Sequence, residues 1–258
     1  MIPQPAIVEW GRRVRWPTED QVEQDLLLSR LIVEIASDGY LRDELVFRGG
    51  TCLHKLFTGA THRYSEDLDF VRRTAGGIGD LTRALTGIGE RLAMRVNTQI
   101  SQQPKVYFRA PFESGSGVMR IKIEMNTFER SPVRPLVQMN HAVDTSWFAG
   151  SADVTTFALP ELVSTKLRAL FQRSKGRDLF DLWLAIEQLG VDSADLVECF
   201  VAYRPRGYTG RRAELNLREK LADAAFRDDI VPLVAQWPDD YDIDGAAEML
   251  IAEVLSRL

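Results

Sequence analysis

The sequence predicts an α+β protein, with a mixed α/β part over residues 1–155 and an all-helical part over residues 156–258. Before Pro160, short apolar runs with a period of two alternate with helical stretches and glycine-rich turns. After Pro160 the apolar period is helical almost throughout. The length of 258 residues fits one large domain or two small ones.

The composition is that of a globular protein and excludes several classes. Apolar residues make up 45% and charged residues 27%, which excludes collagen-like, mucin-like and wholly disordered chains. No apolar run approaches the roughly 18 residues of a membrane span, and the first residues lack the pattern of a secretory signal. Cys52 and Cys199 alone, with three histidines, argue against a disulfide framework or a structural zinc site. We therefore expect a cytoplasmic protein without membrane partners.

The elements follow in order along the chain. Thr18 and Gln21 form a capping box for a helix that ends near Gly39. The pattern then predicts a strand over 44–47, a helix over 51–57, a strand over 67–71, a helix over 80–97, a hairpin of 106–112 with 118–125 and a further strand over 133–137. Helices are predicted over 162–171, 177–188, 194–202, 214–225 and 246–258.

The sharpest local motif is Ser65-Glu66-Asp67-Leu68-Asp69-Phe70. On a strand, Asp67 and Asp69 project from the same face while Leu68 and Phe70 point into the core. Two such carboxylates repel one another unless a cation lies between them, and Mg²⁺ prefers oxygen ligands while leaving positions open for phosphates. A solvated strand face is the alternative.

Two further segments favour a phosphate and metal site. Phe47-Arg48-Gly49-Gly50-Thr51 runs from a strand into a helix, where glycines and free N–H groups allow close approach of a phosphate. Thr51 adds a hydroxyl, and Lys55 follows one turn later. Glu124, on a strand beside the aspartates, would complete a three-carboxylate site for two metals; the alternative is a hairpin strand with one wet face.

A basic stretch opens the helical part. It places five positive charges in twelve residues and is followed directly by two aspartates; the seven residues are Lys166, Arg168, Arg173, Lys175, Arg177, Asp178 and Asp181. Beside the preceding motifs, Lys166 is a candidate triphosphate contact. Asp178 alone could simply cap its helix.

Together these motifs resemble the DNA polymerase β superfamily of nucleotidyltransferases, and more narrowly the AbiEii toxins, which include the mycobacterial MenT proteins. The matching segments are Phe47-Arg48-Gly49-Gly50-Thr51, Arg63-Tyr64-Ser65-Glu66-Asp67-Leu68-Asp69, Lys166 and Arg177-Asp178-Leu179-Phe180-Asp181. They span about half the chain in the family's order. The separation of the glycine pair from the aspartates by residues 51–66 is also that of the AbiEii version.

The resemblance implies a polymerase-β-like core, a mixed sheet with helices, and a helical domain that closes over the nucleotide. It implies transfer of a nucleoside monophosphate from an NTP to the 3′ end of tRNA, with release of pyrophosphate and a block of translation, and restraint by an antitoxin. Asp67 and Asp69 would bind Mg²⁺, and Glu124 would be the third ligand, a position whose identity varies across the superfamily. Arg48, Gly49, Gly50, Thr51, Lys55 and Ser65 would lie at the nucleotide, and Lys166 and Asp178 would be an essential pair.

Two clusters of arginines are candidates for an RNA-binding face. One joins Arg12, Arg13 and Arg15 to Trp10 and Trp16; the other joins Arg204, Arg206, Arg211, Arg212 and Arg218 to Tyr203 and Tyr208. Solvated loops and helix ends are the alternative. Ser65 is a candidate phosphorylation site that would repel the triphosphate. Rival functions are nucleotidylation of a protein or small-molecule hydroxyl, a non-catalytic nucleotide- or partner-binding module, and a structural adaptor.

Overall fold

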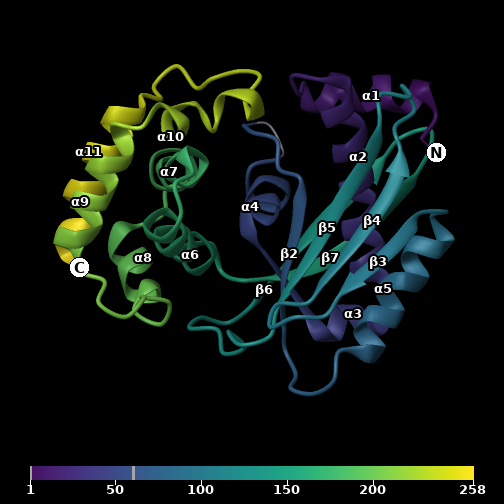
Figure 1. The fold of residues 1–258 in the computed structure, drawn as a ribbon, viewed down its shortest axis with the longest axis horizontal. Helices are drawn as coiled ribbons and strands as arrows, with labels where there is room; N and C mark the ends of the chain where they lie inside the picture. The colour runs from purple at the N-terminus through teal and green to yellow at the C-terminus, as the bar shows by residue number, and fades with distance from the viewer. Residues whose placement is uncertain (1, 60–61) are drawn as a thin grey trace. The chain divides into compact units, whose positions relative to one another are not determined.

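The computed structural model describes residues 2–59 and 62–258, so positions 60 and 61 of the predicted 51–66 spacer lie outside the described residues. The chain forms two compact units (Figure 1). The first contains the residues up to Pro132 together with Leu136–Phe157, and the second contains Val133–Pro135 and Ala158–Leu258.

A seven-stranded mixed sheet organises the first unit, in the order β3-β4-β5-β2-β1-β7-β6. The strands are β1 (Leu45–Arg48), β2 (Asp67–Arg72), β3 (Arg95–Gln99), β4 (Lys105–Pro111), β5 (Val118–Asn126), β6 (Val137–Asp144) and β7 (Ala149–Thr156). The central strand β2 pairs antiparallel with β1 and parallel with β5. Both aspartates of the Asp-x-Asp motif therefore lie at the middle of the sheet.

Helices cover one face of this sheet. They are α1 (Gln4–Val14), α2 (Glu19–Ser37), α3 (Gly39–Glu44), α4 (Gly49–Cys52) with the π-helical η1 (Leu53–Phe57), and α5 (Gly79–Arg91). The long helix α2 packs on β5, β6 and β7, while α5 packs on β3 and β4 and also contacts α2. The apolar side chains of alternate strand positions, such as Phe108 and Ile121, are fully buried there.

Local sequence signals predict several elements correctly. The Thr18 hydroxyl accepts a hydrogen bond from the main-chain N–H of Gln21, whose side chain accepts one from Thr18 N–H, so the capping box begins α2 as expected. Strands β4 and β5 form the predicted antiparallel hairpin, with Gly115 at a left-handed φ of 71° in its turn. Both motifs depend only on residues close together in the chain.

Two predictions in this unit were wrong. The helix expected over 80–97 ends at Arg91, because Ala93 adopts a left-handed φ of 54° and the chain then continues as β3. Val96 and Thr98 are β-branched and suit that strand. The strand expected over 133–137 starts instead at Val137, since the main-chain N–H groups of Val133 and Arg134 donate to the buried Glu161 carboxylate.

The second unit is helical. Its elements are α6 (Leu159–Gln172), α7 (Gly176–Trp183), η2 (Leu184–Gln188), α8 (Ser193–Phe200), α9 (Gly210–Leu221), α10 (Ala224–Asp228), η3 (Val231–Leu233), α11 (Ile243–Glu253) and η4 (Leu255–Arg257). The ring of Phe180 packs against Trp183 and Tyr241, with centroids 5.8 and 4.9 Å away. Helix α6 contacts α7, α8 and α9.

The predicted fold class, an α+β core followed by an all-helical part, is confirmed. Within the described ranges, no helix is both long and apolar enough to cross a bilayer.

Candidate active site

The turn between β1 and α4 brings the two glycines to the sheet's central strands. Gly49 has a φ of +85°, a conformation that favours glycine. A Cβ at this position would collide with the carboxylate of Asp69 on the neighbouring strand. Gly49 of the glycine motif and Asp69 of the Asp-x-Asp motif, 20 residues apart in the chain, are therefore packed directly against each other.

Thr51 connects the same two motifs through its hydroxyl. The side chain is only 1% exposed. Its Oγ1 donates a hydrogen bond to the main-chain carbonyl of Asp67 and lies 2.9 Å from Ser65 Oγ. Thr51 thus fixes the strand that carries the aspartates, and a buried hydroxyl already engaged in this way suits positioning better than direct contact with a phosphate.

The two aspartates project from one face of β2, as predicted. Leu68 and Phe70 point to the other face and are 0% and 3% exposed. Burial, and after it the charge of Asp67, raises the pKa of Asp69. The chain itself therefore offsets the negative charge of Asp69 only in part.

Lys122, on the adjacent strand β5, bridges the carboxylates of Asp67 and Glu124. In the parallel β2–β5 register, Asp67 lies beside Lys122 and Asp69 beside Glu124. Lys122 Nζ is 3.0 Å from Asp67 Oδ2 and 3.1 Å from Glu124 Oε2. Burial alone would lower the pKa of Lys122, but the two carboxylates raise it. The ammonium group marks a position at which a cation is favourable.

The donor set fits a divalent cation at Asp67 and Asp69. A buried carboxylate whose negative charge is only partly offset, beside a second carboxylate that already contacts an ammonium group, provides surroundings that a hard cation prefers. The expected three-carboxylate cluster is not assembled: in the described part of the chain, no group of three or more acidic, His or Cys side chains is placed to hold a metal. Instead, Glu124 is paired with Lys122 and, at 3.5 Å, with Lys105.

Two basic residues of the predicted nucleotide site are already paired. Arg48 lies beside Asp69 in the β1–β2 register, and its Nη1 is 2.6 Å from Glu129 Oε2. Lys55 is buried, with 3% of its side chain exposed, and its Nζ is 2.6 Å from Asp25 Oδ2. The expectation that Lys55 binds nucleotide is corrected on this ground, because its ammonium lies in the core.

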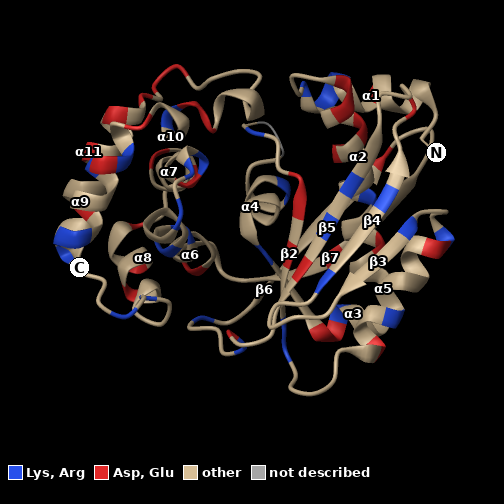
Figure 2. Ribbon diagram, viewed as in Figure 1, with Lys and Arg blue, Asp and Glu red and all other residues tan. Residues whose placement is uncertain are grey.

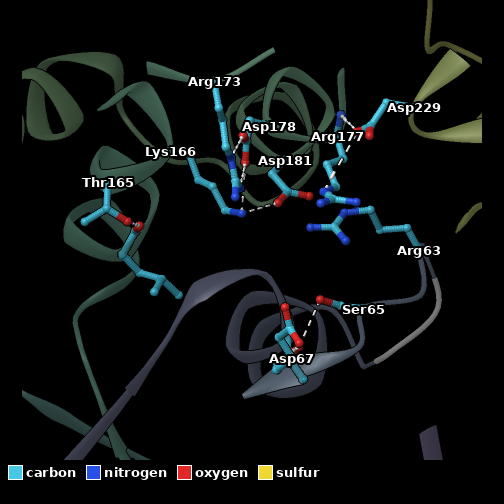
Figure 3. A network of polar contacts seen from close by, with 12 residues as sticks. Arg63, Ser65, Asp67, Thr165, Lys166, Arg173, Arg177, Asp178, Asp181 and Asp229 are labelled. Atoms are coloured by element: carbon cyan, nitrogen blue, oxygen red, sulfur yellow. Dashed lines mark hydrogen bonds and ion pairs between the residues drawn. The ribbon is translucent and has the colours of Figure 1, made fainter. Parts of the chain in front are cut away.

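In the second unit, Lys166 on α6 joins a buried ionic network with α7 (Figure 3). Its Nζ is 3.3 Å from Asp178 Oδ1 and 2.8 Å from Asp181 Oδ2, and both aspartates are 0% exposed. Arg173 donates two hydrogen bonds to Asp178, at 2.7 and 2.8 Å. Asp178 therefore organises basic side chains, and the alternative in which it merely caps its helix is not realised.

The charges around Asp178 also shift its titration. Burial raises the pKa of this carboxyl, but Lys166 and Arg173 outweigh burial and lower it. Arg173 and Lys122 were not predicted as site residues. Alternation along β5 does place Lys122 on the face of Glu124, whereas nothing in the local pattern distinguishes Arg173 from its basic neighbours.

The predicted aromatic partners of an RNA-binding face are buried. Trp10 and Trp16 are 4% and 7% exposed, and Tyr203 and Tyr208 are 6% and 5% exposed. Trp10 donates a hydrogen bond to Asp25, and Tyr203 donates one to Glu161. The expectation that Tyr203 and Tyr208 are available for stacking on bases was wrong, and the two tryptophans are likewise buried in the core of their unit.

A family model described as nucleotidyl transferase AbiEii toxin, type IV TA system, matches residues 30–246 of the chain. The chain belongs to this family. Membership establishes a nucleotidyltransferase toxin of a type IV toxin–antitoxin system, with an NTP substrate and an antitoxin partner. The resemblance drawn from the four motifs is thereby confirmed.

Two solved structures share the fold of this chain. The chain is similar to JHP933 from Helicobacter pylori, at 17% identity and a TM-score of 0.55, over 92% of this chain and 91% of that one. It is equally similar to a putative nucleotidyltransferase from H. pylori, at 18% identity and 0.55, over 92% and 93%. MenT4, a nucleotidyltransferase toxin from Mycobacterium tuberculosis H37Rv, aligns at 15% identity and a TM-score of 0.48, over 95% of this chain and 98% of that one. Among curated proteins, none matches.

Proposed function

We propose that this AbiEii toxin transfers a nucleoside monophosphate from an NTP to the 3′ hydroxyl of tRNA and thereby blocks translation. The observation that carries the proposal is the contact of Gly49 with the Asp69 carboxylate beside Asp67. It places a glycine turn, which lets a phosphate approach the main chain, next to carboxylates suited to a metal.

The reaction is an in-line displacement at the α-phosphorus. The RNA hydroxyl oxygen forms a bond to this phosphorus, the bond to the bridging oxygen of the β-phosphate breaks, and pyrophosphate leaves. The hydroxyl proton passes to solvent or to a nearby carboxylate, for which Glu124 is the candidate. Bound Mg²⁺ would supply charge stabilisation of the α-phosphate and the leaving group.

The chain's own residues divide the remaining work. Asp67 and Asp69 hold the metal, while the main chain of Gly49 and Gly50 takes the triphosphate with Ser65 alongside. Arg48 reaches the nucleotide only if it exchanges Glu129 for phosphate. Likewise, Glu124 can ligate a second metal only when Lys122 releases it, because their present separation is 3.1 Å.

Lys166 and Asp178 are proposed as the essential pair of the second unit, which would close over the nucleotide. The Asp178 carboxylate holds the cationic ends of Arg173 and Lys166 in one cluster, from which both can donate hydrogen bonds to a triphosphate. Lys166 acts there as a point charge held in place by its two aspartates.

The acceptor is tested with chemically matched tRNA. Intact total tRNA and tRNA whose terminal cis-diol has been oxidised with periodate are incubated with the toxin, Mg²⁺ and each labelled NTP. Label entering only intact tRNA supports transfer to the 3′ end. Equal labelling of both preparations would place the acceptor elsewhere on the RNA, and label found only in protein or small molecules would exclude an RNA acceptor.

A further inference from the structure

Three arginines stand side by side across neighbouring strands of the sheet. Arg95 on β3 is the register partner of Arg109 on β4, and Arg109 is the partner of Arg120 on β5. Cross-strand partners project from the same face, with strands spaced about 5 Å apart. All three side chains are exposed. We refer to Arg95, Arg109 and Arg120 as the arginine row.

The charge of the arginine row is not neutralised within the described part of the chain. None of its members forms an ion pair there. Other arginines of the sheet, such as Arg48 and Arg72, each contact a carboxylate. Like charges directly opposite each other destabilise a sheet, so an unrelieved row of three indicates an external polyanion as its partner.

The arginine row lies on the face of the sheet opposite α5. Gly89 of α5 packs against Val96 and Phe108, whose side chains alternate with those of the row. Figure 2 shows basic positions on β3, β4 and β5. The row also has an aromatic neighbour, because the Arg120 guanidinium lies 4.3 Å from the centre of the Tyr107 ring.

The arginine row adjoins the proposed transfer site on the same face. Lys122 follows Arg120 by two positions on β5 and therefore projects from that face. Its ammonium contacts Asp67 at 3.0 Å. Two strand positions correspond to about 7 Å, so the row begins roughly one nucleotide from the aspartates.

We propose that the arginine row binds the phosphate backbone of the acceptor RNA immediately upstream of the 3′ hydroxyl. This inference rests on the proposed function, which brings an RNA end to Asp67 and Asp69. Guanidinium groups pair well with phosphates, and a row leading away from the aspartates matches a strand whose terminal nucleotide lies there. The three arginines are exposed to solvent and therefore accessible to an RNA strand.

The test compares triple variants of the full chain that lose the same charge. R95Q/R109Q/R120Q removes the row, and R42Q/R83Q/R91Q removes three arginines of α3 and α5 whose side chains are 52%, 78% and 59% exposed. Binding of a fluorescent single-stranded RNA ending in CCA is measured over a salt series, with NTP binding measured in parallel. R95K/R109K/R120K keeps the charge.

The row variant is expected to bind the RNA ten- to a hundredfold more weakly. The slope of the logarithm of the binding constant against the logarithm of the salt concentration should be smaller in magnitude by about 2, because three phosphate contacts on a single strand are lost. The control triple and the lysine triple should retain most of the slope, and NTP affinity should be unchanged. RNA affinity of the row variant equal to that of the control triple would overturn the inference, as would a wild-type protein that does not bind the RNA.

These results are separable from the proposed function. If the wild-type protein binds RNA through the row but transfers no nucleotide to it, the inference stands and the tRNA acceptor is lost. If nucleotide enters tRNA while the row variant binds and reacts as the control does, the function stands and the inference is overturned.

Discussion

Gly49 lies so close to the carboxylate of Asp69 that a Cβ atom at position 49 would collide with it. The contact depends on the left-handed φ of +85° at Gly49, and it joins the glycine turn to the middle of the sheet. Because Thr51, two residues later, also holds the main chain of Asp67, the two motifs form one structural unit. The β1–α4 turn thus positions Asp67 and Asp69, the proposed metal ligands.

Replacing Gly49 with Ala should abolish nucleotide transfer. The methyl group would displace the Asp69 carboxylate, and the positive φ adds about 1 kcal/mol of strain. Gly115→Ala is the matched control, since Gly115 has a φ of 71° but open space around its Cβ position. We expect G115A to cost similar stability and to retain activity in a labelled-NTP assay. Full activity of G49A would show that the contact is dispensable.

Removing the Lys122 ammonium should strengthen metal binding. Lys122→Met eliminates the cation that contacts Asp67 and Glu124, so Mn²⁺ titrated by electron paramagnetic resonance should bind roughly three- to tenfold more tightly. Lys105→Met, which removes a lysine that contacts Glu124 at 3.5 Å, is the control and should have a smaller effect. Weaker Mn²⁺ binding by K122M would mean that Lys122 supports the metal site.

The Asp178 carboxylate should stabilise the fold in a pH-dependent manner. Its pKa is lowered in the folded protein, so its contribution is present above the unfolded value of about 4 and is lost as the pH falls through the folded pKa. Asp178→Asn should cost about 3 kcal/mol of unfolding free energy at pH 7, because it breaks a buried ionic network. That deficit should shrink in acid.

The control for this measurement is Asp195→Asn in the same unit. Asp195 pairs with Arg134 at 2.7 Å, but its side chain is 45% exposed, so the loss should stay below about 1 kcal/mol. Urea unfolding of both variants between pH 3 and 7 gives the comparison. A loss of unfolding free energy in D178N that does not change with pH would contradict a lowered pKa of Asp178.

A negative charge at Ser65 should inhibit the toxin. Ser65 Oγ is 2.9 Å from Thr51 Oγ1, beside the turn proposed to hold the triphosphate. Ser65→Asp is expected to weaken NTP binding at least tenfold by charge repulsion, and phosphorylation would act in the same direction. Ser65→Ala should keep most of the affinity. Equal NTP affinity of S65D and S65A in calorimetry would argue against Ser65 as a regulatory site.

Motifs read from neighbouring residues were predictable, and those that depend on distant packing were not. The Thr18–Gln21 capping box and the shared face of Asp67 and Asp69 follow from local geometry. The burial of Lys55 against Asp25 does not, because helical spacing alone does not show which partner a helix face meets. The burial of Tyr203 was equally unpredictable. In the sequence this residue adjoins a basic segment, but in the fold its hydroxyl group donates a hydrogen bond to Glu161.

One misassignment arose from competing signals. The segment 80–97 carries a helical pattern, yet the chain turns at Ala93 after the helix has ended, and strand β3 begins at Arg95. The strand pairing of β3 with β4 is a tertiary effect that overrides local propensity. The arginine row exists only because of that pairing, so the sequence pattern by itself could not reveal it.

Nucleotidyl transfer to tRNA is tested most directly by following the position of the label. Wild-type protein and Asp67→Asn are each incubated with Mg²⁺, total tRNA and NTPs labelled at the α- or the γ-phosphate. We expect the α-label to enter tRNA with the wild-type protein, the γ-label to appear in pyrophosphate, and D67N to lose activity at least a hundredfold while remaining folded. Entry of the γ-label into tRNA, or equal transfer by D67N, would contradict this function and the role of Asp67.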